Sequence, residues 1–475
     1  MRVYFPLFLA FPFLSLFANN THLITVQELL EPLVIGLIAG IIVTKLVKGK
    51  ALLFITFAWV MFYVMGLVRV TMLDIPEVWD LADLCAPMYT LMVAIVGFSM
   101  WKKRPTLKAL KNGEKFASLA GIILVLITIG EIGMSYEAEV AFDESPDITN
   151  IEHTMSDKPN ILLIMPDGYS RADVLMDKFG FDNGPFLDTL TDMGYTISTD
   201  SHANYAHTHL SLSSTLNMMY LDDIGDKLGS GTANHQYAKE MIRDNKVMNI
   251  LRDNGYTLVQ IDSNWEATRT NELYDINLCN VSATTNELVL LFSNTSIMAL
   301  IGGGLDGDLH ANRLCFFDSL DDPASWETGP GPYFIMAHVV MPHPPYLFNA
   351  EGEPLILGTL CENCYINYLQ FFNSQLPRAI DGFDGTVIIM SDHGWGSDKR
   401  GDWDAMEAKD IHTRFATFVA TNDASIDPNV SSVNIMRQVF GMPLLEDRAF
   451  LSDYQTSYDF EEVTNVINEI DESKT

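Results

Sequence analysis

Four side chains that can bind a metal or move a proton stand directly after apolar stretches of the sequence. Asp167, His343 and the adjacent pair Asp392 and His393 occupy these positions, and Thr208 stands between two histidines. Taken alone, each residue has an ordinary structural interpretation in a turn, a helix cap or a rigid loop. Together they combine carboxylates, imidazoles and a hydroxyl. A divalent metal held by such a set can lower the pKa of a threonine hydroxyl and make it a nucleophile.

The segments that precede these residues predict an α/β fold. Short apolar runs alternate with helix-like segments at 185–190 and 248–252. We expect strands at 160–165, 257–261, 333–341, 386–390 and 415–420. This alternation favours a mostly parallel sheet with helices on both faces. Ligands of such sheets gather at the carboxyl ends of the strands, so the candidate residues are expected to converge on one edge.

Charge divides the chain into two parts. The full sequence of 475 residues carries a formal net charge of −32. Up to residue 135 there are 11 Lys and Arg against 8 Asp and Glu, whereas the remainder holds 18 against 53. A nucleic-acid partner is excluded because it requires a basic surface. The chain therefore combines an apolar, slightly basic front with a strongly acidic part that faces water.

The apolar front predicts an all-α transmembrane domain over residues 1–135. Its five apolar runs each approach the length that crosses a bilayer as a helix. They lie at 3–18, 32–47, 51–68, 84–101 and 116–134. The first run also resembles the apolar part of a signal peptide, but an A-x-A-like cleavage pattern does not follow it. We therefore expect about five spans, the first of them uncleaved.

Loop charges orient these spans in a plasma membrane. The loops after the second and fourth runs are basic, and the loop after the third run is acidic. Because basic loops stay in the cytoplasm, the amino terminus is predicted to be cytoplasmic and the chain beyond the fifth span extracytoplasmic. We expect a linker at 136–157, a catalytic domain at 158–447 and an acidic tail at 448–475.

Four cysteines in the predicted extracytoplasmic part suit an oxidising compartment. We favour one disulfide between Cys279 and Cys315 and another between Cys361 and Cys364. A zinc ribbon built from the same four is the alternative, although only one CxxC pair is present.

Four blocks of the sequence, in order, resemble the sulfatase-like, alkaline-phosphatase superfamily. The first begins Lys158-Pro-Asn-Ile-Leu-Leu-Ile-Met-Pro-Asp-Gly, and the second is Asn204-Tyr-Ala-His-Thr-His-Leu-Ser-Leu-Ser-Ser. The later blocks are Pro342-His-Pro-Pro-Tyr346 and Ser391-Asp-His-Gly394. The resemblance covers roughly 158–420 and is strongest to the subgroup of membrane proteins with several amino-terminal spans. It implies an alkaline-phosphatase-like fold.

The resemblance also implies a role for each candidate residue. Thr208 would be the nucleophile, and His343 and His412 would lie along the anionic oxygens of the substrate, one of them protonating the leaving group. The ligands of a metal ion would be Asp167, Thr208, Asp392 and His393. Other polar residues nearby are expected to stabilise the structure or to contact the metal ligands rather than the metal itself. Arg171 is expected in a salt bridge, and the others are His202, His207, His209 and His338.

Two departures from the superfamily's motifs narrow the expected chemistry. Sulfatases convert a cysteine or serine in a C/S-x-P-x-R context to formylglycine, whereas Thr208 lacks both the proline and the arginine. Ordinary sulfate-ester hydrolysis is therefore disfavoured. Val339 stands where a carboxylate for a second ion would be expected, which favours one metal. Carboxylate and imidazole ligands suit zinc or manganese, with magnesium less favoured.

A threonine nucleophile, one metal and a multispan anchor resemble lipoteichoic acid synthases and phosphoethanolamine transferases. This resemblance implies transfer of a phospho-alcohol head group from a membrane lipid donor to an envelope glycan or lipid acceptor, through a covalent threonine intermediate. One alternative is a sulfatase-like hydrolase or phosphodiesterase with water as the acceptor. Another is a non-catalytic scaffold or receptor with the same fold. The sequence does not specify an oligomeric state.

Overall fold

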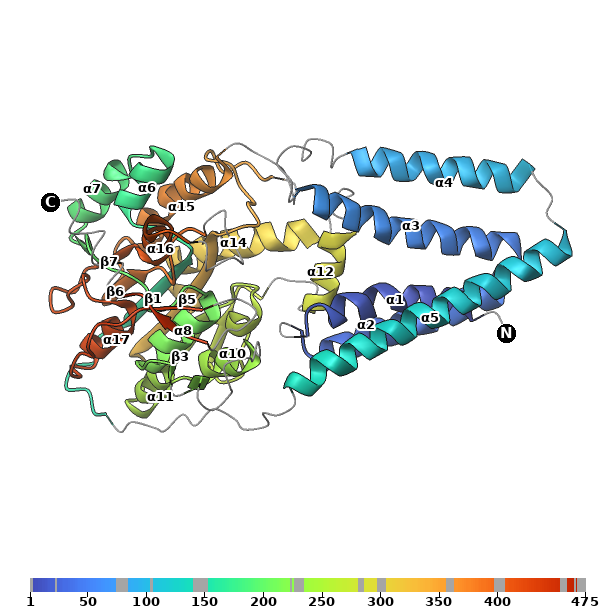
Figure 1. Cartoon of the computed structure of the whole chain (residues 1–475). Helices are drawn as coiled ribbons and strands as arrows, with labels where there is room; N and C mark the ends of the chain where they lie inside the picture. The colour runs from blue at the N-terminus through green and yellow to red at the C-terminus, as the bar shows by residue number, and fades with distance from the viewer. Residues whose placement is uncertain are drawn as a thin grey trace. The chain divides into compact units, whose positions relative to one another are not determined.

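A computed structural model gives the fold of the chain (Figure 1). The residues that it describes are 3–21, 24–73, 84–102, 106–139, 153–222, 224–225, 235–280, 286–296, 305–355, 363–396, 406–452, 459–464 and 467. The acidic loop predicted after the third apolar run, most of the predicted linker, Cys361 and much of the predicted tail lie outside this range.

The chain divides into two compact units. The first comprises Met1–Ala141 together with Thr284–Leu305, and the second comprises Phe142–Ala283 and Asp306–Thr475. The short segment in the first unit comes from the middle of the acidic part of the sequence, and the predicted domain boundaries did not separate it. It contains α12 (Glu287–Thr295).

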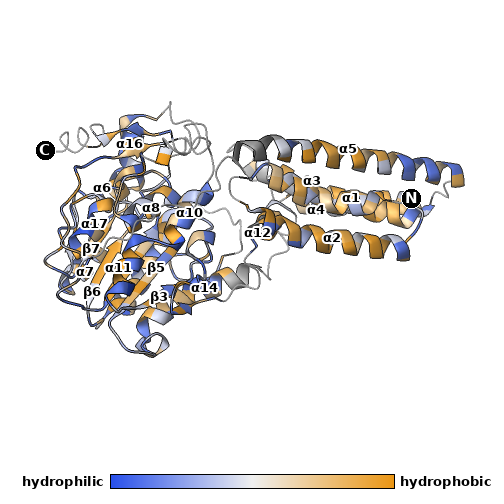
Figure 2. Ribbon diagram, turned by 90° about the horizontal axis from the view of Figure 1, so that it is seen from below, coloured by the Kyte–Doolittle hydropathy of each residue, from blue (hydrophilic) through white to orange (hydrophobic). Residues whose placement is uncertain are grey.

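The first unit is all-α and apolar (Figure 2). Among the described residues of this unit, four helices are long and apolar enough to cross a membrane, and a fifth, shorter apolar helix precedes them. The short helix is α1 (Tyr4–Ala18), and the four long ones are α2 (Val26–Leu46), α3 (Lys50–Leu73), α4 (Cys85–Lys102) and α5 (Leu107–Glu139). Many large aliphatic side chains on α2, α4 and α5 are exposed. This exposure is typical of helices whose apolar surfaces are long enough to face the hydrocarbon of a bilayer.

The second unit is built on a seven-stranded sheet in the order β2-β7-β6-β1-β5-β3-β4. The five strands from β6 to β4 are parallel, and β7 runs antiparallel to both of its neighbours. The strands are β1 (Ile161–Asp167), β2 (Thr196–Ile197), β3 (Thr257–Ile261), β4 (Ile276–Leu278), β5 (Tyr333–Pro342), β6 (Thr386–Met390) and β7 (Val419–Thr421). The mostly parallel sheet predicted from the sequence is confirmed.

Helices cover both faces of this sheet, because alternate residues of each buried strand point to opposite sides. In β1, Leu162 and Ile164 belong to one core, and Ile161, Leu163 and Met165 belong to the other. The first core is closed by α6 (Ala172–Phe179), α7 (Gly184–Asp192), α14 (Leu305–Asp321) and α15 (Cys364–Ile380). The second is closed by α8 (Thr208–Asn217), α10 (His235–Arg243), α11 (Lys246–Asp253) and α17 (Ser432–Val439).

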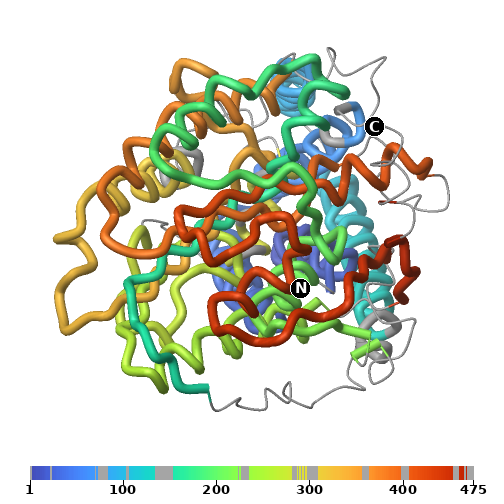
Figure 3. Tube along the Cα trace, turned by 90° about the vertical axis from the view of Figure 1, so that its left-hand side faces the viewer, coloured from blue at the N-terminus to red at the C-terminus, as the bar shows by residue number. Residues whose placement is uncertain are grey.

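The strand predicted at 415–420 is wrong in its first half. Phe415 ends helix α16 (Ala408–Phe415), and β7 begins only at Val419. The segment between them instead lies beside residues around 200, where His202 pairs with Ala416 in an isolated antiparallel bridge (Figure 3). Short apolar runs do not distinguish the last turn of a buried helix from a strand.

Two disulfide-bonded positions and a small strand pair add further links within the second unit. The predicted disulfide between Cys279 and Cys315 is present. Cys364 is also disulfide-bonded, and its predicted partner Cys361 lies outside the described residues. Part of the predicted tail forms a small antiparallel pair, β8 (Phe450–Leu451) with β9 (Glu461–Glu462).

Candidate active site

The carboxyl ends of three adjacent strands bring four of the candidate residues to one edge of the sheet. β1 lies between β6 and β5, and Asp167 is its last residue. Asp392 and His393 follow the end of β6, and His343 follows the end of β5. The backbone N–H of His343 donates to the carbonyl oxygen of Asp167 at 3.1 Å. The parallel topology therefore brings these side chains together, as expected at the carboxyl ends of the strands in a parallel sheet.

Thr208 reaches the same edge from the start of α8. It is the first residue of the helix, after His207 in an extended conformation. The hydroxyl of Ser211, one turn later, donates to the carbonyl oxygen of Asp392 at 2.6 Å and fixes the helix against the β6 loop. The Thr208 hydroxyl oxygen lies 3.1 Å from His393 Nε2. The positive end of the helix dipole favours negative charge at this position.

The hydrogen bonds of His393 determine which ring nitrogen faces Thr208. Its Nδ1 lies 2.8 Å from the carbonyl oxygen of Gly394. Because a carbonyl oxygen only accepts, Nδ1 carries the proton of the neutral ring. Nε2 is then left with a lone pair directed toward the Thr208 hydroxyl, which is the arrangement of either a base or a metal ligand.

Two carboxylates are buried beside this pair. Asp392 is inaccessible to solvent, and Asp167 is 5% exposed. One oxygen of Asp392 accepts from the backbone N–H groups of Gly168 at 2.9 Å and His393 at 2.8 Å. Burial, and then the negative charge of Asp167, raise the pKa of Asp392 to about 7.

The neighbouring histidine does not supply a compensating charge. His393 Nε2 lies 3.3 Å from the second oxygen of Asp392 and 3.6 Å from a carboxylate oxygen of Asp167. Burial, and then the guanidinium of Arg414, hold the pKa of His393 well below its usual value, so the ring is neutral near pH 7. Among the described residues, Asp392 forms no ion pair with a lysine or arginine. A bound cation would relieve this repulsion.

His338 is an additional candidate ligand at the same place. It lies within β5 and is 1% exposed. Its Nδ1 is 2.7 Å from the Thr268 hydroxyl, while its Nε2 is buried without a hydrogen bond among the described residues. Asp167, His338 and Asp392 each offer a ligand atom within 4.8 Å of the other two. Burial, and then Arg313 and His343, lower the pKa of His338 to about 3, so it is a neutral donor.

This set of donors fits a divalent metal ion. Two carboxylates supply negative charge, and the imidazoles of His338 and His393 are neutral, as metal ligands must be. Mixed oxygen and nitrogen ligands suit zinc or manganese. The buried Nε2 of His338 supports the same interpretation, because a polar atom rarely stays buried without a partner.

His343 faces a small cavity next to the carboxylates. Gly168, His343, Tyr365, His393 and Trp395 line it. The Nδ1 of His343 lies 2.7 Å from the carbonyl oxygen of Pro344, so Nδ1 carries the proton of the neutral ring and Nε2 holds the lone pair. Gly168 adopts φ of +72°, a conformation that glycine tolerates better than other residues. The cavity is therefore bounded by the turn after β1 and by two imidazoles.

His412 has a different environment. It lies in α16, and its Nε2 is 3.0 Å from a carboxylate oxygen of Asp173. The Nε and Nη2 atoms of Arg171 donate to the two oxygens of the same carboxylate at 2.9 and 3.0 Å. The predicted salt bridge of Arg171 is thus confirmed. Contact with the substrate stays a prediction for His412.

Arg414 positions two of the loops that carry the site, and the sequence did not single it out. Its Nε donates to the carbonyl oxygen of Ala206 at 2.6 Å, and its Nη1 donates to that of Gly394 at 3.3 Å. One buried guanidinium therefore fixes the loop before Thr208 and the loop after His393.

The other histidines near Thr208 contact structural groups. His202 lies 3.0 Å from a carboxylate oxygen of Asp447, and His207 lies 3.1 Å from the carbonyl oxygen of Ser452. The ring of His209 stacks on that of His235, with centroids 4.0 Å apart. The sequence predicts the same structural or outer role for His338, but His338 is a candidate metal ligand. One feature of the sequence distinguishes it, since it is the one strongly polar side chain in the apolar strand Tyr333–Pro342.

Comparison with known proteins gives matches among solved structures alone. No known protein-family profile matches the chain, and no curated protein does. The chain is similar to the zinc complex of the C-terminal periplasmic domain of EcEptC from Escherichia coli, at 13% identity, covering 67% of this chain and 96% of that one with a TM-score of 0.42.

It is also similar to the integral membrane lipooligosaccharide phosphoethanolamine transferase A from Neisseria meningitidis. The identity is 12%, the coverage is 93% of this chain and 94% of that chain, and the TM-score is 0.43. A third similar structure is a protein in the alkaline phosphatase superfamily from Vibrio parahaemolyticus, at 14% identity, 70% and 82% coverage and a TM-score of 0.41.

Proposed function

We propose that the protein is a membrane-anchored, metal-dependent transferase that moves a phospho-alcohol head group from a lipid to a glycan or lipid acceptor. The observation that carries the proposal is the Thr208 hydroxyl 3.1 Å from His393 Nε2, beside two buried carboxylates. A hydroxyl at a helix N-terminus next to a lone-pair nitrogen is suited to nucleophilic attack. The threonine at position 208, which lacks the proline and arginine of the sulfatase motif, supports phosphoryl rather than sulfuryl chemistry.

The residues that would hold the metal are Asp167, Thr208, Asp392 and His393, with His338 as an additional donor. When bound, one zinc or manganese ion would favour ionisation of the threonine hydroxyl and offset charge on the phosphoryl oxygens.

The first half of the reaction transfers the head group to the enzyme. The Thr208 hydroxyl gives its proton to water and its oxygen forms a bond to phosphorus, and the bond from phosphorus to the lipid alcohol oxygen breaks. His343, as the imidazolium, gives its Nε2 proton to that departing oxygen. The products are a free lipid alcohol and a phosphodiester on Thr208.

The second half reverses these roles. The neutral His343 takes the proton of an acceptor hydroxyl, whose oxygen then attacks phosphorus. The bond to Thr208 breaks, and the threonine oxygen takes a proton from water, which restores its hydroxyl. A site that contains one nucleophile and one proton carrier is sufficient for both halves, provided that the lipid alcohol leaves before the acceptor enters.

Intact-mass measurement of the purified full chain after incubation with a defined phospholipid tests this proposal. We expect a mass increase equal to one phospho-alcohol head group, located at Thr208 by peptide mapping and missing in Thr208→Ala. Absence of the adduct under conditions in which the lipid is consumed would overturn the proposal. Release of free head group in place of a modified acceptor would indicate hydrolysis with water.

We also propose that the second unit is extracytoplasmic and the amino terminus cytoplasmic, because the basic loops of the first unit stay inside. A membrane-impermeant maleimide should label a single cysteine introduced at the exposed position Asp188 in intact cells. It should label one introduced at Lys48 only after the cells are opened. The reverse pattern would overturn the orientation.

A further inference from the structure

The loop that follows β3 is polar, buried and close to the candidate metal donors. β3 pairs in parallel with β5, so the loop lies at the same edge of the sheet as the strand that contains His338. Its side chains Asp262, Ser263 and Thr268 are all buried. Burial of polar groups is costly unless they are hydrogen-bonded. The hydrogen bonds of this loop therefore indicate what its polar side chains do.

Two hydroxyl groups of the loop form a chain that ends on His338. The Ser263 hydroxyl lies 2.7 Å from the Thr268 hydroxyl, which in turn lies 2.7 Å from His338 Nδ1. At the other end of the chain, Ser263 Oγ accepts from the backbone N–H of Trp265 at 3.1 Å. The ring of Trp265 also packs against that of His338, with centroids 5.4 Å apart. The same loop thus holds the imidazole by a hydrogen bond and by a ring contact.

The loop is itself anchored on both sides of Thr268. Asp262 accepts from the backbone N–H and from the hydroxyl of Thr270, each at 2.8 Å. The short helix η2 (Glu266–Thr268) is tied to α10, because Glu266 forms an ion pair with the buried Lys239. The position of the Thr268 hydroxyl is therefore set by the fold around it.

The other nitrogen of His338 is the one left for a metal ion. One nitrogen of His338 and one oxygen each of Asp167 and Asp392 lie within 4.8 Å of one another. Nδ1 already contacts Thr268, whereas Nε2 is buried and has no hydrogen bond among the described residues. An ion beside the two carboxylates would therefore take its nitrogen ligand from Nε2.

The direction of the hydrogen bond at Nδ1 determines whether Nε2 can bind a cation. A neutral imidazole carries one proton, so one ring nitrogen donates and the other holds a lone pair. If Nδ1–H donates to the Thr268 oxygen, Nε2 keeps its lone pair. If the Thr268 hydroxyl donates to Nδ1, the proton lies on Nε2 and the ring cannot bind the ion. In metal sites the partner of the second nitrogen commonly sets this choice.

Ser263 makes the first direction possible. Once Thr268 accepts from Nδ1–H, its own hydrogen needs an acceptor, and the Ser263 oxygen is 2.7 Å away. That oxygen has two lone pairs, so it can accept from Thr268 and from the N–H of Trp265 together. The opposite direction would leave an Nε2–H of His338 buried without an acceptor among the described residues, which is costly.

We propose that Thr268 is a positioning residue of the metal site: it accepts the Nδ1 proton of His338 and thereby directs the Nε2 lone pair at the ion, while Ser263 holds Thr268. This inference rests on the metal of the proposed function. It adds that a loop outside all four motif blocks sets the affinity of the site for its ion, although neither hydroxyl contacts the ion.

Zinc affinity of the purified full chain, measured by competition with a fluorescent chelator at fixed pH, tests the proposal. Thr268→Val keeps the shape of the side chain and removes the hydroxyl. We expect its zinc dissociation constant to rise by about 10- to 100-fold, as for other groups that orient a metal ligand. Thr268→Ser restores a hydroxyl and should stay within about threefold of the wild type. Equal affinity of Thr268→Val and wild type would overturn the proposal.

Thr270→Val is the matched control. It removes a hydroxyl from the same loop, but the partner of that hydroxyl is Asp262 rather than a histidine. We expect zinc affinity within about threefold of the wild type. A loss as large as that of Thr268→Val would indicate general damage to the loop and would overturn the specific role of Thr268.

The His338→Ala background separates positioning from a structural effect. Thr268→Val should weaken zinc binding in the wild-type chain and have no further effect once the ring is removed, because it acts through that ring. Ser263→Ala repeats the comparison with a milder change, should Thr268→Val not fold, and is expected to cost about threefold in the wild-type chain alone. Equal losses in both backgrounds, or no loss from His338→Ala itself, would overturn the proposal. A wild-type chain that binds no zinc would overturn the metal of the proposed function as well, so the two failures are distinguishable.

Discussion

Two groups of histidine and aspartate side chains in the second unit are built from the same residue types and differ in charge balance. Around His412, the carboxylate of Asp173 also receives two hydrogen bonds from Arg171. Around His393, two buried carboxylates face neutral imidazoles. The first arrangement is balanced by its own protein partners. In the second, Asp392 forms no ion pair with a lysine or arginine among the described residues, and a bound cation would offset the charge of the two carboxylates.

The difference teaches that burial without compensation is a better indicator of a functional site than residue type. A carboxylate that is paired and hydrogen-bonded stabilises the fold, whereas two adjacent buried carboxylates destabilise it unless something else is bound. Such a cost is retained where it serves chemistry. The following predictions test whether the two groups differ in this way.

Thr208→Ala should produce the largest effect on transfer. Removing the nucleophile is expected to lower the rate by about 10⁴-fold or more. Release of lipid alcohol from a labelled phospholipid measures it. Thr208→Ser should retain a measurable rate, and Thr189→Ala, on the exposed face of α7, should have none of this effect. A Thr208→Ala rate within tenfold of wild type would refute the role of the hydroxyl.

His343→Gln should lower transfer by roughly 10²-fold, because a proton carrier contributes about that much. His343 lines the cavity beside Gly168, and its Nδ1 contacts the carbonyl oxygen of Pro344. The loss should shrink with a donor lipid analogue whose leaving group is a nitrophenol, since that group departs without protonation. An equal loss with both donors would count against His343 as the acid.

Metal affinity should fall as the pH is lowered through about 7. The pKa of Asp392 is raised to about 7 in the metal-free protein, so below this pH a metal ion must displace a proton, and affinity drops about tenfold per pH unit. His393, whose pKa is lowered, has no proton to lose there. Competition with a fluorescent chelator from pH 5.5 to 8.5 measures the slope. A flat profile would contradict the burial argument.

His412→Asn should have the smallest effect on chemistry and a clear effect on folding. Loss of the hydrogen bond to Asp173 is expected to destabilise the second unit by about 1–3 kcal/mol. A lower unfolding temperature, followed by proteolysis or intrinsic fluorescence, measures this loss. The transfer rate at low temperature should fall by less than about tenfold. A 10²-fold or larger loss with unchanged stability would place His412 among the proton carriers.

The edge of the sheet that carries the site could be predicted from the sequence, because Asp167, His343 and Asp392 each follow an apolar strand. Strand ends are local features, and the parallel topology follows from alternation with helices. His338 was harder to assign. It sits inside a strand, and only the neighbouring strand and the Thr268 hydroxyl determine that its ring lies beside Asp167 and Asp392.

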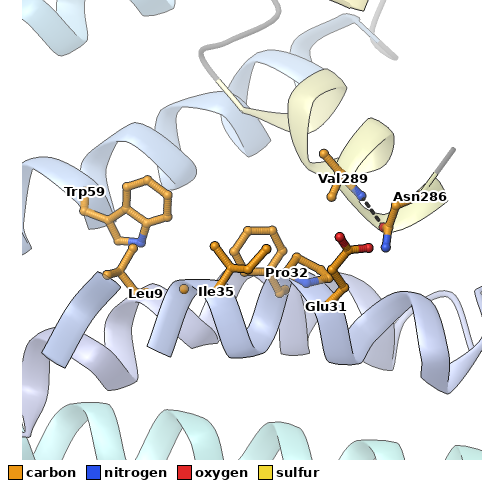
Figure 4. Close-up of a pocket in the computed structure, with 9 residues that line it drawn as sticks. Leu9, Glu31, Pro32, Ile35, Trp59, Asn286 and Val289 are labelled. Carbon is orange, nitrogen blue, oxygen red and sulfur yellow. Dashed lines mark hydrogen bonds between the residues drawn. The ribbon is translucent and has the colours of Figure 1, made fainter. Parts of the chain in front are cut away.

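The membership of α12 in the first unit could not be predicted from local pattern. The apolar run from Leu288 to Phe292 is too short to span a bilayer and resembles any core helix. What determines its place is a long-range fit, with Asn286 donating to Glu28 and Phe292 packing on aromatic rings of other helices. Asn286 and Val289 also line a cavity together with residues of α1, α2 and α3 (Figure 4). Contacts between residues so distant in sequence leave no periodic signal.

Elemental analysis of the purified full chain tests the central claim most directly. Aspartates 167 and 392, two buried carboxylates beside neutral imidazoles, should hold one zinc or manganese ion per chain, and Asp392→Asn should hold none at the same free metal concentration. Asp173→Asn, in the balanced group, should keep the full ion. Metal-free wild-type protein under these conditions, or equal metal in wild type and Asp392→Asn, would contradict the account.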